Sequence, residues 1–139
     1  MSSIASLYLL RGPDIQAFAT SGRAPDHLRL QDTVFWSGYF WMYLLLFLDE
    51  QGVPVSQSRH DTTLTDVEAT YFLLTTEHQP YLPQLDPATF DQAAFDEYLS
   101  GMGWDDFDEA PIAAEETLTV LRDQVAALTE DHALLIDIA

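Results

Sequence analysis

The stretch ALLIDI, residues Ala133 to Ile138, alternates its side chains well enough to predict a β-strand near the end of the chain. In such a strand Leu135 and Asp137 face away from the remaining long apolar residues. A second strand is predicted at the opposite end, over Ile4 to Leu10. Because the two best strands lie at the two ends of the chain, we expect them to pair in one sheet.

Capping residues and prolines predict five helices between these strands. Gly12-Pro13-Asp14 and Asp86-Pro87 each place a proline at a first helical position, and Thr65-Asp66-Val67-Glu68 has the pattern of a capping box. The helices are expected over about 12–22, 33–51, 65–76, 86–101 and 113–128. A short edge strand is expected at Val53-Pro54-Val55.

The predicted fold class is therefore α+β, with about five helices packed on a small sheet that pairs the N- and C-terminal strands. The length of 139 residues is that of one domain, so a single globular domain is predicted over residues 1–139. Hydrophobic residues make up 47% of the chain, which is enough to form a core without disulfides or a structural metal.

The most apolar segment is the run from Val34 to Leu48, which Ser37 and Gly38 interrupt. A membrane-spanning helix needs about 20 apolar residues, so this shorter run is predicted to form a buried helix. Large side chains follow it in two stripes at helical spacing, namely Trp36, Phe40, Tyr43 and Phe47, and Phe35, Tyr39, Met42 and Leu46. The stripes favour a place in the core, while a homodimer interface through Val34 to Leu48 and a pocket for an apolar ligand stay open.

The composition is strongly acidic, with 23 acids against five arginines, no lysine and a formal net charge of −18. Fourteen of the acids and one of the arginines fall in residues 86–139. Such a surface repels nucleic acid and anionic lipid, so no nucleic acid and no membrane is expected as a partner. The absence of cysteine excludes thiol chemistry and disulfides and fits the cytoplasm. No signal-peptide pattern occurs at the N-terminus. No glycine-rich nucleotide-binding motif occurs either, so no cofactor is expected.

The two ends of the chain resemble a known family. Residues Met1 to Leu10, followed by Gly12-Pro13-Asp14-Ile15-Gln16-Ala17-Phe18, are similar to the opening of the YfbM-like family of uncharacterised bacterial proteins. Leu121 to Ala127, a turn and the strand Leu134 to Ile138 are similar to its C-terminal part, and Trp104 stands where that family tends to carry a tryptophan. The resemblance implies an α+β fold and a bacterial protein, and it implies no catalytic residues.

The sharpest local feature is the acidic, aromatic loop Trp104-Asp105-Asp106-Phe107-Asp108-Glu109, which Glu115 and Glu116 follow. The first interpretation is that this loop is a partner-binding surface. Trp104 and Phe107 would then anchor the contact, while the carboxylates engage Arg or Lys of a basic protein. A calcium site is an alternative, but the ligand order and the glycine of an EF-hand are absent. A solvated loop in front of a helix N-terminus is the third interpretation.

None of the four histidines pairs with another at metal-ligand spacing, so no metal site is predicted. The candidate catalytic residues are His60 and Asp61, because an Asp can orient a His as a general base. Adjacent loop residues rarely face each other, and Asp61 also fits an ordinary turn. A site assembled in space from His60, Asp61 and His27 stays open.

Three hypotheses for function follow from these patterns. The first is a non-enzymatic protein-interaction domain of the immunity or inhibitor kind that docks on a basic partner. The second is a small hydrolase or metal-dependent enzyme with a His/Asp site assembled in space. The third is that the acidic surface is an adaptation to salt only.

Overall fold

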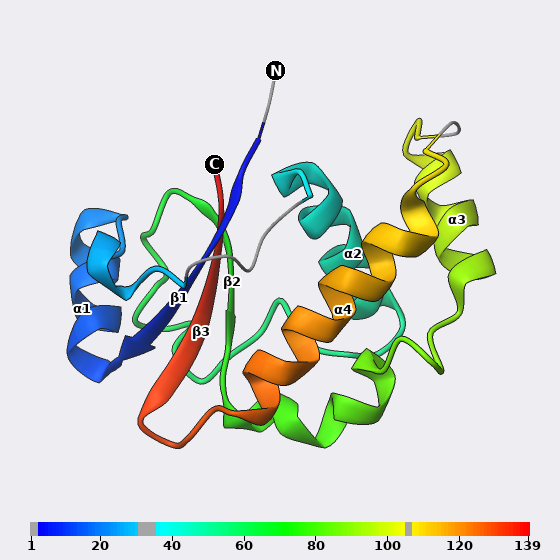
Figure 1. Cartoon of the computed structure of the whole chain (residues 1–139). Coiled ribbons are helices and arrows are strands. Elements are labelled where there is room, and N and C mark those ends of the chain that lie inside the picture. The colour runs from blue at the N-terminus through cyan, green and yellow to red at the C-terminus, as the bar shows by residue number, and fades with distance from the viewer. Residues whose placement is uncertain (1–2, 31–35, 105–106) are drawn as a thin grey trace.

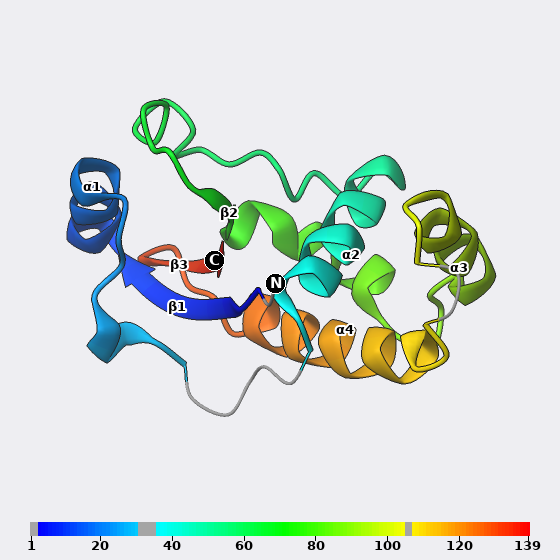
Figure 2. The same cartoon turned by 90° about the horizontal axis from the view of Figure 1, so that it is seen from above.

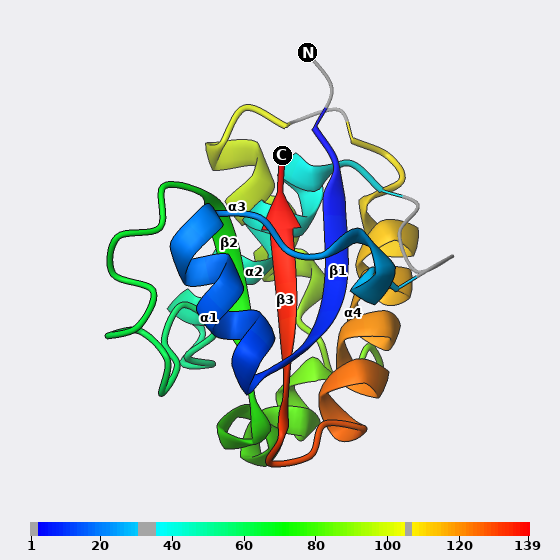
Figure 3. The same ribbon diagram turned by 90° about the vertical axis from the view of Figure 1, so that its left-hand side faces the viewer.

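The terminal strands pair as the sequence predicts. In the computed structural model, which describes residues 3–30, 36–104 and 107–139, β1 (Ala5–Arg11) and β3 (His132–Ile138) are antiparallel. A third strand, β2 (Thr70–Leu74), pairs with the other edge of β3, so the sheet order is β1-β3-β2. Figure 3 shows β3 between its two neighbours. The predicted α+β class and the pairing of the two chain ends are confirmed.

The helices are divided unequally between the two faces of the sheet. The α-helices are α1 (Gly12–Ser21), α2 (Gly38–Glu50), α3 (Gln92–Gly101) and α4 (Ala110–Ala126). Two 3₁₀ segments, η1 (Asp26–Leu28) and η2 (Thr76–Leu85), join them. Figures 1 and 2 show α1 on one side of the sheet, α2 and α4 on the other, and α3 farthest from the sheet.

Because β3 is central, its two faces both enter apolar clusters. Leu134 and Ile136 belong to the main core under α2 and α4, and Leu135 belongs to a smaller core under α1. The predicted division of the strand between two faces is confirmed, but the second core was not predicted. Asp137, which shares the side of Leu135, is only partly buried.

The helix predicted from Thr65 is absent from the structure. Residues 61–66 form turns, and the chain then enters β2 at Thr70. The sequence Tyr71-Phe72-Leu73-Leu74 is rich in strand-forming and large apolar residues, and pairing with β3 satisfies its backbone. The local capping signal is overridden by this long-range pairing. The edge strand predicted at Val53-Pro54-Val55 is also wrong, because both valines are buried there in a loop.

Two predicted helix starts are too early. The helix α2, expected from about residue 33, begins after Ser37, whose hydroxyl accepts a hydrogen bond from the Phe40 amide; residues 31–35 lie outside the described residues. The helix α3 begins after Asp91 rather than after Asp86, whose carboxylate accepts from the amide of Ala88 in a turn. A carboxylate that stabilises a turn is thus indistinguishable in sequence from one that caps a helix.

The helix α2 lies in the interior, with its first stripe facing the core. Phe40 and Phe47 are buried and contact other aromatic rings, including Phe95, at centroid distances of 5.2–5.8 Å. In the second stripe, Tyr39 is 38% exposed and Phe35 lies outside the described residues. A homodimer through this helix would therefore have to use the second stripe, and it stays a prediction.

Candidate functional site

The helical end of the molecule, formed by α2, α3, α4 and the loops that join them, concentrates negative charge. Its described acids are Asp49, Glu50, Asp86, Asp91, Asp96, Glu97, Asp108, Glu109, Glu115, Glu116 and Asp123. Arg122 is the one arginine among the described residues of this end, and it pairs with Asp86 at 3.3 Å and with Asp123 at 3.6 Å. The other nine carboxylates make no ion pair with a described residue.

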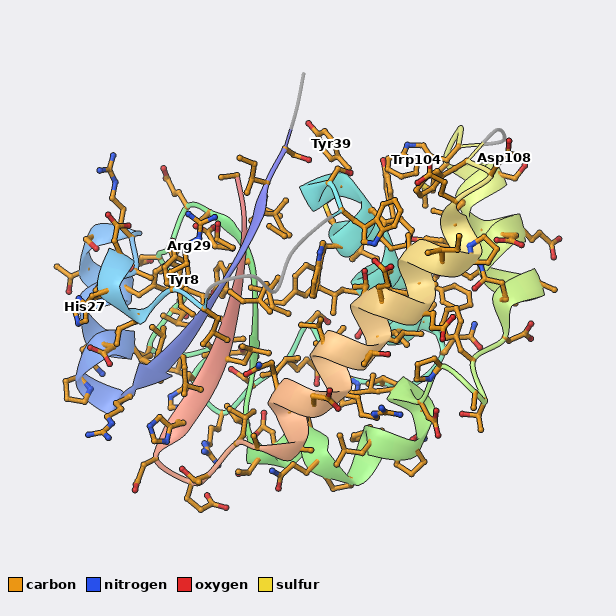
Figure 4. The ribbon with its side chains drawn as sticks, viewed as in Figure 1. Tyr8, His27, Arg29, Tyr39, Trp104 and Asp108 are labelled. Atoms are coloured by element: carbon orange, nitrogen blue, oxygen red, sulfur yellow. The ribbon has the colours of Figure 1, made fainter. Side chains whose placement is uncertain are left out.

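The remaining four arginines belong to the part of the molecule that contains the sheet and α1. Arg11 ends β1, Arg23 follows α1, Arg29 follows η1 and Arg59 lies in the loop before β2. Figure 4 shows His27 and Arg29 at one end of the molecule and Trp104 and Asp108 at the other. The fold therefore converts an uneven charge along the sequence into an uneven charge in space.

The predicted partner-binding loop divides into an inward and an outward part. The ring of Trp104 lies 5.3 Å from that of Tyr43, and the ring of Phe107 lies 5.5 Å from those of Trp104 and Phe40. Both side chains are partly buried, so they extend the aromatic core and present only part of their surface. Asp108 and Glu109 are exposed, and Asp105 and Asp106 lie outside the described residues.

Exposed apolar side chains accompany the carboxylates at this end. Ile112 in the first turn of α4 is 57% exposed, Met102 after α3 is 46% exposed, and Tyr39 in the first turn of α2 is 38% exposed. Single exposed apolar residues are ordinary on protein surfaces. Here they lie at the end of the molecule that carries the unpaired carboxylates.

A pocket of about 390 Å³ opens between α2 and α4, and we call it the α2–α4 pocket. It is lined by Trp36, Trp41, Ile112, Glu115, Glu116, Thr117, Thr119 and Val120. The indole N–H of Trp36 donates to Oε2 of Glu116 at 2.9 Å, which holds that carboxylate at the pocket. Trp41 and Thr117 are buried, whereas Glu115 and Glu116 are exposed, so the pocket has a buried floor and an acidic rim.

His60 lies in a second, larger pocket of about 600 Å³, which we call the histidine pocket. It is lined by Arg11, Gly12, Pro13, Ile15, Arg59, His60, Glu130, Asp131 and His132. Nε of Arg11 donates to Nε2 of His132 at 3.3 Å, and Arg59 pairs with Glu130 at 3.3 Å. Two arginines and two histidines therefore meet where β1 passes into α1.

His60 and Asp61 do not form the predicted dyad. Oδ1 of Asp61 accepts from the amide and the hydroxyl of Ser58, and the ring of His60 makes no hydrogen bond to a described residue. Burial lowers the pKa of His60, and the Arg59 guanidinium lowers it further; Glu77 and Asp61 oppose these effects. The neutral imidazole is therefore favoured. His27 is exposed on η1 and does not line this pocket.

His132 is the member of this pocket that the sequence reasoning missed. The signal was present in the strand pairing, because Arg11 ends the first strand and His132 begins the last. Antiparallel pairing of the chain ends places these two residues opposite each other.

The histidine that is fully buried, His78, has a structural role. Its Nδ1 accepts from the Thr75 amide at 3.0 Å, and its Nε2 lies 2.9 Å from the carbonyl oxygens of Pro54 and Gln57.

The described residues offer neither a metal site nor a membrane-spanning helix. Within residues 3–30, 36–104 and 107–139, no group of three or more acidic or histidine side chains is arranged to hold a metal ion. No helix in the same part of the chain is both long and apolar enough to cross a membrane.

No protein-family model, curated protein sequence or solved structure matches this chain. The resemblance to the YfbM-like family therefore stays a prediction, and the candidate sites rest on their own geometry.

Proposed function

We propose that this chain is a non-enzymatic, cytoplasmic protein-interaction domain of the immunity or inhibitor kind, whose helical end docks on a basic protein. The observation that carries the proposal is the charge of that end, where nine exposed or partly exposed carboxylates have no ion-pair partner among the described residues. Uncompensated carboxylates repel one another in the isolated chain. A basic partner relieves that repulsion when it binds.

The charge and the exposed apolar side chains of the helical end have different roles in binding the partner. The field of the acidic end speeds the encounter with a basic protein and orients it, and this effect weakens as salt rises. The exposed side chains of Ile112 and Met102 then supply apolar contact beside the carboxylates. The charge selects the class of partner, and the apolar contacts resist dissociation.

The experiment starts from an extract of the native host at low ionic strength, from which the chain captures binding proteins. A captured basic protein is purified, and its affinity is measured by calorimetry against rising salt. The test variant carries Asp108→Asn, Glu109→Gln and Glu115→Gln, three exposed acids of the helical end. We expect it to bind about tenfold more weakly or worse.

A control variant carries the same change in charge away from the helical end, through Asp26→Asn, Asp66→Asn and Glu68→Gln, which are also exposed. We expect its affinity to stay within about twofold of the parent. Equal losses in the two variants would show unspecific attraction and overturn the proposal. Failure to capture any basic protein would do so too. A purely salt-adapted protein would show no such partner and would become more stable in molar salt.

The histidine pocket supports a second candidate, a small hydrolase. The specific observation is that His60, whose pKa is lowered by burial, lines one pocket together with His132, Arg11 and Arg59, so imidazoles lie beside cations that suit an anionic substrate. Substitution of His60→Ala and of His132→Ala should each abolish activity in a panel of phosphoester and carboxylic ester substrates. If the unsubstituted protein is inactive on every substrate of the panel, the hydrolase candidate is wrong.

A further inference from the structure

One edge of the sheet has no partner strand among the described residues. The strand β2 pairs with β3 only, and the central strand β3 uses alternate residues for its two neighbours. Ile4 and Ala139 exchange both of their backbone hydrogen bonds at 2.8 Å, so the odd-numbered residues of β3 bond toward β1 and the even-numbered ones toward β2. Within β2, the residues that bond to β3 are therefore Thr70, Phe72 and Leu74.

The backbone groups of Tyr71 and Leu73 point the other way, toward the free edge. They make no hydrogen bond to a described residue. Tyr71 is half-buried and Leu73 is only 4% exposed, and unpaired backbone groups at buried positions are rare in folded proteins. At the opposite edge of the sheet, the carbonyl of Leu7 in β1 accepts from the amide of Leu30 at 2.7 Å. The free edge of β2 therefore presents the row of donors and acceptors that an added strand recognises.

A cavity of about 230 Å³ lies at this free edge, and we call it the β2 slot. It is lined by Val55, Ser56, Gln57, Ser58, Asp61, Tyr71, Phe72 and Leu73. The loop that joins α2 to β2 forms its outer wall, and Figure 3 shows this loop beyond β2. A residue in a packed sheet occupies roughly 160 Å³, from the rise along a strand and the spacings between strands and between sheets. The slot therefore encloses about one to two residues of an added strand.

The outer wall gives the β2 slot a negative charge. Asp61 lines the slot itself, and Oδ1 of Asp49 accepts from the hydroxyl of Ser56, which also lines it, at 3.0 Å. Neither carboxylate makes an ion pair with a described residue. Arg59 belongs to the same loop, but its guanidinium pairs with Glu130 at 3.3 Å. The wall therefore suits a segment that carries Lys or Arg.

We propose that the β2 slot binds an extended, basic peptide segment of a partner protein, which adds to the sheet as a fourth strand beside β2. Its main-chain groups pair with those of Tyr71 and Leu73, and its Lys or Arg side chains reach Asp49 and Asp61. An extended chain offers N–H and C=O groups at the spacing of a strand edge. The slot shares no residue with the variants that test docking of the helical end, so either proposal can fail without the other.

The first experiment tests whether the edge is free in the isolated protein. Amide hydrogen exchange is followed in ¹H–¹⁵N NMR spectra. We expect the Tyr71 amide to exchange at least about tenfold faster than the Phe72 amide, which bonds to β3. Equal protection of the two amides would show that the edge already has a partner, and the proposal would be wrong.

Three synthetic peptides of equal length then test the occupant. Acetyl-Lys-Val-Thr-Val-Lys-amide combines the charge with strand-forming residues. Acetyl-Glu-Val-Thr-Val-Glu-amide reverses the charge, and the lysine peptide with its three central amides N-methylated loses the donors that pair with the edge. We expect the lysine peptide to shift the amide signals of Tyr71 and Leu73, and the other two to bind about tenfold more weakly or worse. The proposal is overturned if about 1 mM lysine peptide shifts neither signal, or if either of the other peptides binds equally well.

Matched variants test the acidic wall. The double variant Asp49→Asn and Asp61→Asn keeps an oxygen for each serine that donates to these side chains and removes both charges. It should bind the lysine peptide about three- to fivefold more weakly. The control, Asp26→Asn with Asp131→Asn, removes two exposed charges outside the slot and should leave binding within about twofold. Equal losses in the two double variants would contradict the assignment of the basic side chains to this wall.

Discussion

The substitution Thr117→Val tests whether the floor of the α2–α4 pocket carries an unsatisfied hydroxyl. Thr117 lies in the middle of α4, is 2% exposed and has no hydrogen-bond partner among the described residues. Valine replaces the hydroxyl by a methyl group of similar size, so packing is kept, and its helix propensity is close to that of threonine. The change therefore removes a buried polar group and little else.

The expected effect is an increase in the free energy of unfolding. Burying a hydroxyl without a partner costs about 1–3 kcal/mol, so we expect Thr117→Val to stabilise the protein by about 1–2 kcal/mol. For a chain of this size that corresponds to a rise in Tm of roughly 3–8 °C. The measurement is urea unfolding followed by circular dichroism, with the requirement that the denaturant dependence is the same in parent and variant.

Thr119→Val is the matched control, because Thr119 lies two residues further along the same helix and donates to the Glu115 carbonyl. That substitution removes a hydrogen bond that is made, so no gain in stability is expected. If Thr117→Val leaves stability unchanged or lowers it, the hydroxyl has a partner in solution. The reasoning about the pocket floor then fails.

Three further predictions concern the fold. Gly38→Ala should lower stability by about 1–3 kcal/mol in urea unfolding, because a Cβ there lies 2.9 Å from the carbonyl carbon of Ile4. His78→Leu should cost about 2–4 kcal/mol by the same assay, since it leaves the partners of both ring nitrogens without a hydrogen bond. Burial raises the pKa of Asp137, so the stability contributed by its protonated form is fully present below about pH 4 and lost as pH rises through the raised pKa. Asp137→Asn should therefore be more stable than the parent at pH 7 and equal to it below pH 4, and a constant difference would contradict this.

The chain ends show what local sequence can predict. The alternation in Ala133 to Ile138 and the apolar start at Ile4 to Leu10 identify both strands, and their positions at the two ends predict that they pair. The amphipathic helix α4 follows equally from local spacing. These elements are predictable because the pattern that selects them is contained within the element itself.

The candidate sites were predicted only in part. The sequence located most of the acids in residues 86–139 and singled out His60, but it assigned Trp104 and Phe107 to a partner-binding surface, and their rings extend the core. Their side chains meet Phe40 and Tyr43 from a different helix, and no pattern near residue 104 specifies that contact. A ligand pocket at the aromatic stripes was left open, and Trp36 does line the α2–α4 pocket, but Trp41 and Thr117 were not predicted to meet there because they lie far apart in the sequence.

The sequence by itself determined the fold class, the paired chain ends and the sign of the charge, because each depends on composition or on local periodicity. The tertiary structure decided the rest. It made residues 70–74 a strand, since pairing with β3 satisfies that backbone. It also gathered carboxylates from three helices at one end and placed two unpartnered polar groups under an acidic rim. These features depend on which segments pack together, and distance along the chain carries no information about that.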